Sequence, residues 1–158
     1  MFPARGATSV TAFNHVGQCV TDLDRSKRFY CELFGFVLER EINPPDDSSA
    51  KLMSLTPPLG MTAAYLVRDG LVLELLHYSA AAQTKPYRAR TLNEPGLTHI
   101  SLSVDDIDAV CARVPEYGGA VIASSNIGAA MFVRDPDGQL VELLPMTYRR
   151  HLDAQGYR

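Results

Sequence analysis

The stretch LTHISLSVDDID, residues 97–108, has the alternating pattern of a β-strand. Apolar and small polar side chains alternate along it. Because successive side chains of a strand point to opposite faces, Ile100, Leu102 and Val104 share one face. His99 lies on the other face, together with two serines. An imidazole on the small, polar face of a strand is placed to line a cavity and not to fill a core.

The surroundings of His99 recur earlier in the chain, at a shift of 84 residues. At this shift, residues 14–38 match 98–122. DGLVLELLHY (69–78) also resembles DGQLVELLPM (137–146), but no gap-free shift joins both pairs. In these pairs His15 matches His99, and Glu74 matches Glu142. The His-to-Glu separation is 59 residues in the first copy and 43 in the second, so the first copy has a longer middle. An internal repeat of this kind predicts two equivalent structural units.

Each copy predicts the same order of elements. A strand begins at the histidine, and Asp22 or Asp106 then supplies a side-chain oxygen that caps the next helix. Gly35 and Gly118–Gly119 are placed to end these helices, and Pro115 is expected to stop or kink the second one early. Further strands are expected at 36–41, 51–56, 61–68 and 71–78 in the first half, and at 120–124, 129–134 and 139–144 in the second.

These elements predict three segments. Residues 12–78 form a first module, 79–96 a polar connection, and 97–146 a second module. Each module is roughly a strand, a helix and three strands. A connection as long as 79–96 is uncommon unless it binds something or links domains.

Composition excludes several classes of protein. The formal net charge is −3 and no Lys/Arg cluster exceeds a pair, so we expect no nucleic-acid partner. No apolar run approaches a membrane-spanning length, and the first ten residues contain no stretch of the signal-peptide type, so we expect a cytoplasmic protein with no membrane partner. The three cysteines show no Cys-x-x-Cys spacing, which argues against a disulfide framework and a thiolate zinc site.

The two glutamates point to a metal. Glu74 and Glu142 lie inside the apolar strands LVLELL and LVELLP, where an unpaired carboxylate would cost several kcal/mol of desolvation or stay protonated. His15 and His99 lie at matching positions of the repeat. Two imidazoles and two carboxylates that converge between the sheets would bind a divalent metal ion, which neutralises the carboxylates.

Four segments resemble the vicinal oxygen chelate superfamily, which includes glyoxalase I, methylmalonyl-CoA epimerase, extradiol dioxygenases and the bleomycin- and fosfomycin-resistance proteins. They are FNHVGQCVTDLDRSKRFYCELFGF, LVLELLHY, LTHISLSVDDID and FVRDPDGQLVELLP, and the resemblance covers about residues 12–146. It implies an α+β fold in which two βαβββ modules form a curved, open, mixed sheet around a metal ion. It also implies a homodimer, since in many members the sites lie between modules of two chains.

By the same resemblance, His15, Glu74, His99 and Glu142 are the metal ligands, in an order similar to that of nickel-activated bacterial glyoxalase I. One divalent ion per site is implied, whether Ni, Zn, Co, Mn or Fe. The implied activity is that of a glyoxalase I-like isomerase or lyase acting on a small α-oxo or hemithioacetal substrate through an enediolate. Glu142 is the catalytic base by its position in the family, and Glu74 is a ligand or second base.

Two alternatives remain open. One is an extradiol-type Fe(II) ring-cleaving dioxygenase, which would use His15, His99 and Glu142. The other is a metal-free binding protein that sequesters a small molecule such as a drug, against which four intact ligands argue.

The chain departs from the glutathione-dependent members at two positions. Cys19 and Tyr78 stand where those enzymes have Arg and Asn, which help to hold glutathione. Arg88 and Arg90, in the long connection, could replace the positive charge, or they simply belong to a solvated linker. We therefore predict poor turnover of the methylglyoxal–glutathione adduct.

Overall fold

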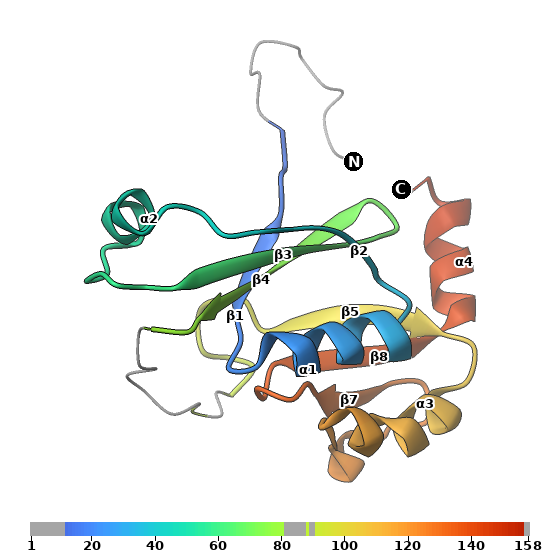
Figure 1. The fold of residues 1–158 in the computed structure, drawn as a ribbon. Coiled ribbons are helices and arrows are strands. Elements are labelled where there is room, and N and C mark those ends of the chain that lie inside the picture. Colours follow the sequence, from blue (N-terminus) through green and yellow to red (C-terminus); the bar gives the residue numbers. More distant parts are fainter. Residues whose placement is uncertain (1–11, 81–87, 89–90, 157–158) are drawn as a thin grey trace.

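The computed structural model describes residues 12–80, 88 and 91–156, and contains two four-stranded mixed sheets with helices packed against them (Figure 1). The expected α+β class is confirmed. The first half contains β1 (Val16–Cys19), α1 (Leu23–Arg28), the π-helical turn η1 (Phe29–Leu33), β2 (Val37–Ile42), α2 (Asp46–Met53), β3 (Met61–Arg68) and β4 (Leu71–Tyr78). The second half contains β5 (His99–Val104), α3 (Ile107–Arg113), the 3₁₀ turns η2 (Val114–Tyr117) and η3 (Ala123–Ser125), β6 (Ala120–Val121), β7 (Met131–Arg134), β8 (Leu140–Pro145) and α4 (Met146–Ala154).

The two sheets have equivalent topologies. The strand order is β1-β4-β3-β2 in the first sheet and β5-β8-β7-β6 in the second. In each sheet the strand that begins the half runs parallel to the last strand, and the other pairs are antiparallel. Gly17 is the register partner of Glu74, and Ser101 is the register partner of Glu142. The two halves therefore place their glutamates at equivalent points of their sheets.

The expected helix boundaries are confirmed in both halves. Asp22 accepts a hydrogen bond from the Arg25 backbone N–H at 3.0 Å, and Asp106 accepts one from Ala109 at 2.9 Å. Helix α3 ends just before Pro115, and the chain continues as the 3₁₀ turn η2. Gly118 has the left-handed φ of 79° that ends this turn. Gly119 serves another purpose, because a Cβ there would lie 2.7 Å from the Phe29 ring.

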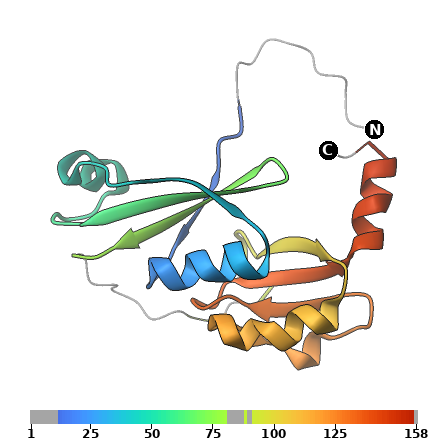
Figure 2. The same cartoon turned by 45° about the vertical axis from the view of Figure 1, so that its right-hand side comes forward.

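One hydrophobic core joins the two halves. Leu73 and Leu75 of β4 pack in the same cluster as Val141 and Leu143 of β8, together with aromatic side chains from α1 and η1 such as Phe29. Figures 1 and 2 show α1 between the first sheet and the strands β5 and β8. We call the face of each sheet that points away from this core its outer face. Because side chains alternate along a strand, Glu74 and Glu142 lie on the outer faces.

A polar junction also links the halves. Asp135, in the turn after β7, is buried and lies 2.9 Å from the hydroxyl of Tyr30 in η1. The Gln18 side-chain amide donates to the same carboxylate. Asp137 accepts hydrogen bonds from the Thr21 backbone N–H at 3.2 Å and from the Thr21 hydroxyl. The second-half turn thus binds side chains and backbone of the first half.

Several sequence-based expectations were wrong in detail. Residues 51–56 were expected to form a strand, but 46–53 form α2. Two aspartates begin this helix and Lys51 lies in its last turn, charges that complement the helix dipole. The strand expected at 120–124 is only two residues long, and α4 was not predicted. Residues 81–87 and 89–90 of the expected connection lie outside the described residues.

None of the helices in the described parts of the chain has the length and apolar character needed to span a membrane.

Candidate metal centre

The first histidine and first glutamate form a pair on the outer face of the first sheet. His15 Nε2 lies 3.0 Å from Glu74 Oε2. Glu74 is only 8% exposed, whereas the His15 side chain is 38% exposed. The register of β1 against β4 produces this contact, because Gly17 has no side chain to cover the carboxylate of its partner Glu74. A buried carboxylate and an exposed imidazole nitrogen therefore face the same opening.

Tyr65 and Arg40 complete the surroundings of this pair. Tyr65 is the β3 partner of Glu74, and its ring packs edge-on against His15 with centroids 5.9 Å apart. The hydrogen bond that its hydroxyl donates to Glu74 raises the pKa of Tyr65, and burial and the glutamate charge add to the effect. Arg40 of β2 stacks its guanidinium over the Tyr65 ring, 4.2 Å from the centroid. A cavity of about 350 Å³ opens here, and its lining includes His15, Arg40, Tyr65 and Val72.

The second histidine and second glutamate form an equivalent pair on the second sheet. His99 Nε2 lies 3.6 Å from Glu142 Oε2. The Ser101 hydroxyl donates to the same carboxylate oxygen at 2.7 Å. Thr98 Oγ1 lies 2.9 Å from His99 Nδ1, and an Nδ1–H donated to this hydroxyl leaves the lone pair of the ring on Nε2, facing Glu142. Phe132, the register partner of Glu142, packs edge-on against the imidazole.

The two pairs do not meet within one chain. No group of three or more His, Cys, Asp and Glu side chains that could hold a metal ion occurs in the described residues. The reason is architectural: the sheets turn their apolar faces toward the shared core, so the outer faces with the two pairs point away from it. The sequence left open whether the four ligands meet within one chain or across a dimer, and the four-ligand set stays a prediction.

The donor atoms of each pair suit a divalent transition metal ion. An imidazole nitrogen and a carboxylate oxygen bind Ni, Zn, Co, Mn and Fe ions, and each pair presents one of each on a single face. Two pairs together would supply two nitrogens and two oxygens. The residues thus fit such an ion, although either pair alone leaves most of a coordination shell to other donors.

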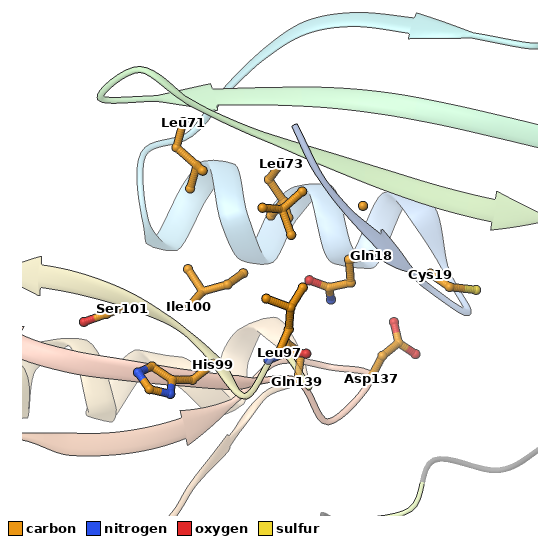
Figure 3. Close-up of a pocket in the computed structure, with 12 residues that line it drawn as sticks. Gln18, Cys19, Leu71, Leu73, Leu97, His99, Ile100, Ser101, Asp137 and Gln139 are labelled. Carbon is orange, nitrogen blue, oxygen red and sulfur yellow. The ribbon is translucent and has the colours of Figure 1, made fainter. Parts of the chain in front are cut away.

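A larger cavity of about 490 Å³ separates the edge strands β1 and β5 (Figure 3). Leu71, Leu73 and Ile100 point toward one another across it, and its lining also includes His99 and Ser101. This space is lined mainly by apolar side chains and lies between the halves. Glu74 and Glu142 are not among the residues that line it.

The two positions that depart from glutathione-dependent relatives lie at the end of the first sheet. Cys19 ends β1 and is exposed, and Tyr78 ends β4 on the same outer face as Glu74. The Tyr78 hydroxyl donates to Met53 Sδ of α2 at 2.9 Å. Arg88 pairs with Glu94 at 2.7 Å, in keeping with a solvated linker, and Arg90 lies outside the described residues.

Sequence reasoning missed Tyr65, Arg40 and Phe132. Tyr65 and Phe132 are the antiparallel partners of the two glutamates, so hairpin register alone would have found them. Arg40 follows a register shift in β2, which no sequence pattern announced. Ser101 was placed correctly on the face of His99, but its bond to Glu142 was not predicted.

Comparison with known proteins shows the family of the chain. Residues 12–143 match the Glyoxalase/Bleomycin resistance protein/Dioxygenase superfamily. The chain belongs to this superfamily. A probable lactoylglutathione lyase of Synechocystis is 28% identical over 136 residues, which cover 83% of this chain and 92% of the relative. A catechol-2,3-dioxygenase of Bacillus subtilis is 27% identical over 144 residues, 86% of this chain but 43% of that protein.

The crystal structure of a glyoxalase family protein from Bacillus cereus shares the fold, with a TM-score of 0.73 at 19% identity. The superposition covers 90% of this chain and 98% of that one. The resemblance inferred from the sequence is therefore confirmed at the level of the superfamily. The superfamily includes lyases and dioxygenases, so membership alone does not select a reaction.

Proposed function

We propose that the protein is a metal-dependent, glyoxalase I-like isomerase or lyase that acts on a small α-oxo or hemithioacetal substrate. The observation that carries the proposal is the pair of His–Glu contacts at equivalent positions of two sheets, His15 with Glu74 and His99 with Glu142. The proposed site has a fourth ligand, a second glutamate. This favours proton-transfer chemistry over oxygen activation, since ring-cleaving enzymes of the superfamily use two histidines and one glutamate.

The four side chains would have distinct roles. His15, Glu74, His99 and Glu142 would hold one divalent cation, which when bound supplies Lewis acidity toward two neighbouring substrate oxygens. Glu142 would be the base by its position in the family; its side chain is more accessible than that of Glu74, and the Ser101 hydroxyl orients one of its oxygens. It would take a carbon-bound proton and return it to the adjacent carbon, a contribution of about 10²–10⁴-fold in rate. Glu74, held by Tyr65, would serve as a ligand or second base.

Assembly follows from the placement of the pairs. Because the pairs face away from the shared core of one chain, we infer a homodimer in which each site joins the first pair of one chain to the second pair of the other. Two such sites result from one twofold axis.

Metal titration tests the proposal. Calorimetry with Ni²⁺ and Mn²⁺ should show binding to the wild type that is abolished or sharply weakened in His99→Ala and Glu142→Gln. His151→Ala is the matched control, since this imidazole lies on the exposed side of α4 and should leave affinity unchanged. Wild-type affinity in both ligand variants would refute the four-ligand site.

The dioxygenase alternative has its own test, motivated by the similarity to the Bacillus subtilis enzyme. Protein purified without chelator should contain nickel, cobalt, zinc or manganese and take up no oxygen with catechols. Iron together with catechol-dependent oxygen uptake would favour the dioxygenase instead.

A further inference from the structure

The outer face of the first sheet differs in character on the two sides of Glu74. Val72, Glu74, Leu76 and Tyr78 alternate along β4 and so share this face. On the Val72 side, the cavity near His15 has polar walls that include Asn14, Glu39 and Arg40. On the Leu76 side the surface is apolar. A molecule bound at Glu74 would therefore meet charge in one direction and hydrocarbon in the other.

Helix α2 builds the apolar side. Met53, Leu76 and Tyr78, here called the apolar wall, are half-buried and pack on a fully buried layer formed by Ala50, Leu59, Met61 and Ala63. The bond from the Tyr78 hydroxyl to Met53 Sδ ties the helix to the end of β4.

Hydrogen bonds also fix the first turn of α2. The Asp46 carboxylate accepts hydrogen bonds from the backbone N–H groups of Leu59 and Gly60 at 3.0 and 3.1 Å. The first turn of α2 is thus anchored to the segment that precedes β3 and its last turn to the end of β4, so the wall is a fixed part of the fold.

The wall begins next to the ligand pair. Tyr65 packs edge-on against His15 and also against the cluster under α2. Leu76 follows Glu74 by two residues, roughly 7 Å along the strand, which is within reach of one ring attached to a group bound at Glu74. A charged substituent in this direction would lose hydration against apolar side chains, whereas an apolar one would gain from burial.

We propose that Met53, Leu76 and Tyr78 determine specificity, and that the substrate has an uncharged, apolar substituent, an aromatic ring above all, next to its two neighbouring oxygens. This inference rests on the proposed function, because the metal site places those oxygens. The oxygens lie at His15 and Glu74, and the ring lies along Leu76 toward α2.

Two hydroxamates that differ only in their substituent test the proposal on the Ni²⁺-loaded protein. Both present two neighbouring oxygens, and benzohydroxamate has a phenyl group where acetohydroxamate has a methyl group. Calorimetry should show that benzohydroxamate binds about tenfold to a hundredfold more tightly than acetohydroxamate. A methionine methyl NMR spectrum should show the Met53 signal shifting with benzohydroxamate while that of Met146 stays in place.

Variants test whether the apolar wall causes the preference for benzohydroxamate. Met53→Gln and Leu76→Gln should each bring the two affinities to within about threefold of each other, mainly by weakening the binding of benzohydroxamate. Leu52→Gln is the matched control, because Leu52 is the next residue of α2 and 82% exposed, and it should keep the wild-type preference.

The outcomes separate this inference from the proposed function. Nickel binding with equal affinity for the two hydroxamates, or a phenyl preference that survives both wall variants, would overturn the inference alone. Absence of nickel binding would overturn the proposed function, and the inference with it.

Discussion

Glu74 shows how one buried carboxylate organises its neighbours. It is 8% exposed, and around it His15, Tyr65 and, through Tyr65, Arg40 are arranged by strand register. A carboxylate in an apolar strand is costly unless it is paired, and removing one partner of such a group costs about 1–3 kcal/mol. His15 and Tyr65 supply these partners to Glu74.

Ser101 allows the second pair to be tested without removing a proposed ligand. Its hydroxyl orients Glu142 through a 2.7 Å hydrogen bond. Ser101→Ala should lower Ni²⁺ affinity by about 10- to 100-fold, the usual effect of losing a partner that orients a ligand. Ser103→Ala, on the same face of β5, should have no effect. Calorimetric titration of both variants with Ni²⁺ tests this. A Ni²⁺ affinity of Ser101→Ala equal to that of Ser103→Ala would show that Glu142 needs no orienting hydrogen bond.

The four proposed ligands could be predicted from the sequence, and their neighbours could not. His15, Glu74, His99 and Glu142 occur in two copies at matching positions, and each glutamate interrupts an apolar run. Tyr65 and Arg40 lack such a pattern. Tyr65 is near Glu74 because of hairpin register, and Arg40 is near Tyr65 because β2 shifts its register between Leu38 and Arg40.

At the scale of elements, helix α2 shows where local pattern was insufficient. The segment KLMSLT alternates well enough to suggest a strand, yet the aspartates and serines before it begin a helix that continues through Met53. What holds the helix is distant in sequence: Asp46 binds the backbone of Leu59 and Gly60. β3 and β4, by contrast, were predicted with their observed bounds, because the turn after Arg68 is marked by Asp69 and Gly70.

The polar junction between η1 and the turn after β7 should contribute measurably to stability. Tyr30 is fully buried, and its hydroxyl lies 2.9 Å from the Asp135 carboxylate. Tyr30→Phe removes a hydrogen bond to a charged group and should lower the free energy of unfolding by about 1.5–3 kcal/mol. Tyr148→Phe, on the 46% exposed tyrosine of α4, should change it little. Urea denaturation measures the free energy of unfolding of both variants. Equal values for Tyr30→Phe and Tyr148→Phe would mean that the Tyr30–Asp135 hydrogen bond makes no net contribution to stability.

The same junction predicts a pH dependence. Burial raises the pKa of Asp135, although hydrogen bonds from Tyr30, Gln18 and two backbone N–H groups partly oppose the rise. Between the unfolded pKa of about 3.9 and this higher folded value, the folded chain binds more protons than the unfolded chain, so its stability falls as the pH rises.

Asp135→Asn removes this titration. The stability of the wild type relative to the variant should therefore decrease as the pH is raised from about 4 to 7. Urea denaturation of both proteins across this range gives the difference directly. If the stability of the wild type relative to Asp135→Asn stays constant or grows with pH, the pKa of Asp135 is not raised in the folded chain.

At the scale of the whole molecule, the shared core explains why the two His–Glu pairs lie apart within one chain. Leu73 and Leu75 meet Val141 and Leu143 across the core, so both sheets give their inner faces to packing within the chain. The outer faces, with one His–Glu pair each, take no part in this core. The repeat predicted two equivalent pairs, but it could not predict which faces meet, because that depends on how α1 and η1 pack between the sheets.

Mixing two variants tests whether each site spans two chains. One variant lacks the first pair (His15→Ala with Glu74→Gln) and the other lacks the second pair (His99→Ala with Glu142→Gln), so neither homodimer has an intact site. In a mixed dimer, one site combines the two damaged pairs and the other combines the two intact ones. Refolding an equimolar mixture should therefore restore about a quarter of the wild-type Ni²⁺ sites, since half of the dimers are mixed and each has one intact site. Mixtures that bind no nickel, or light scattering that shows only a monomer, would place the pairs in separate sites and refute the shared one.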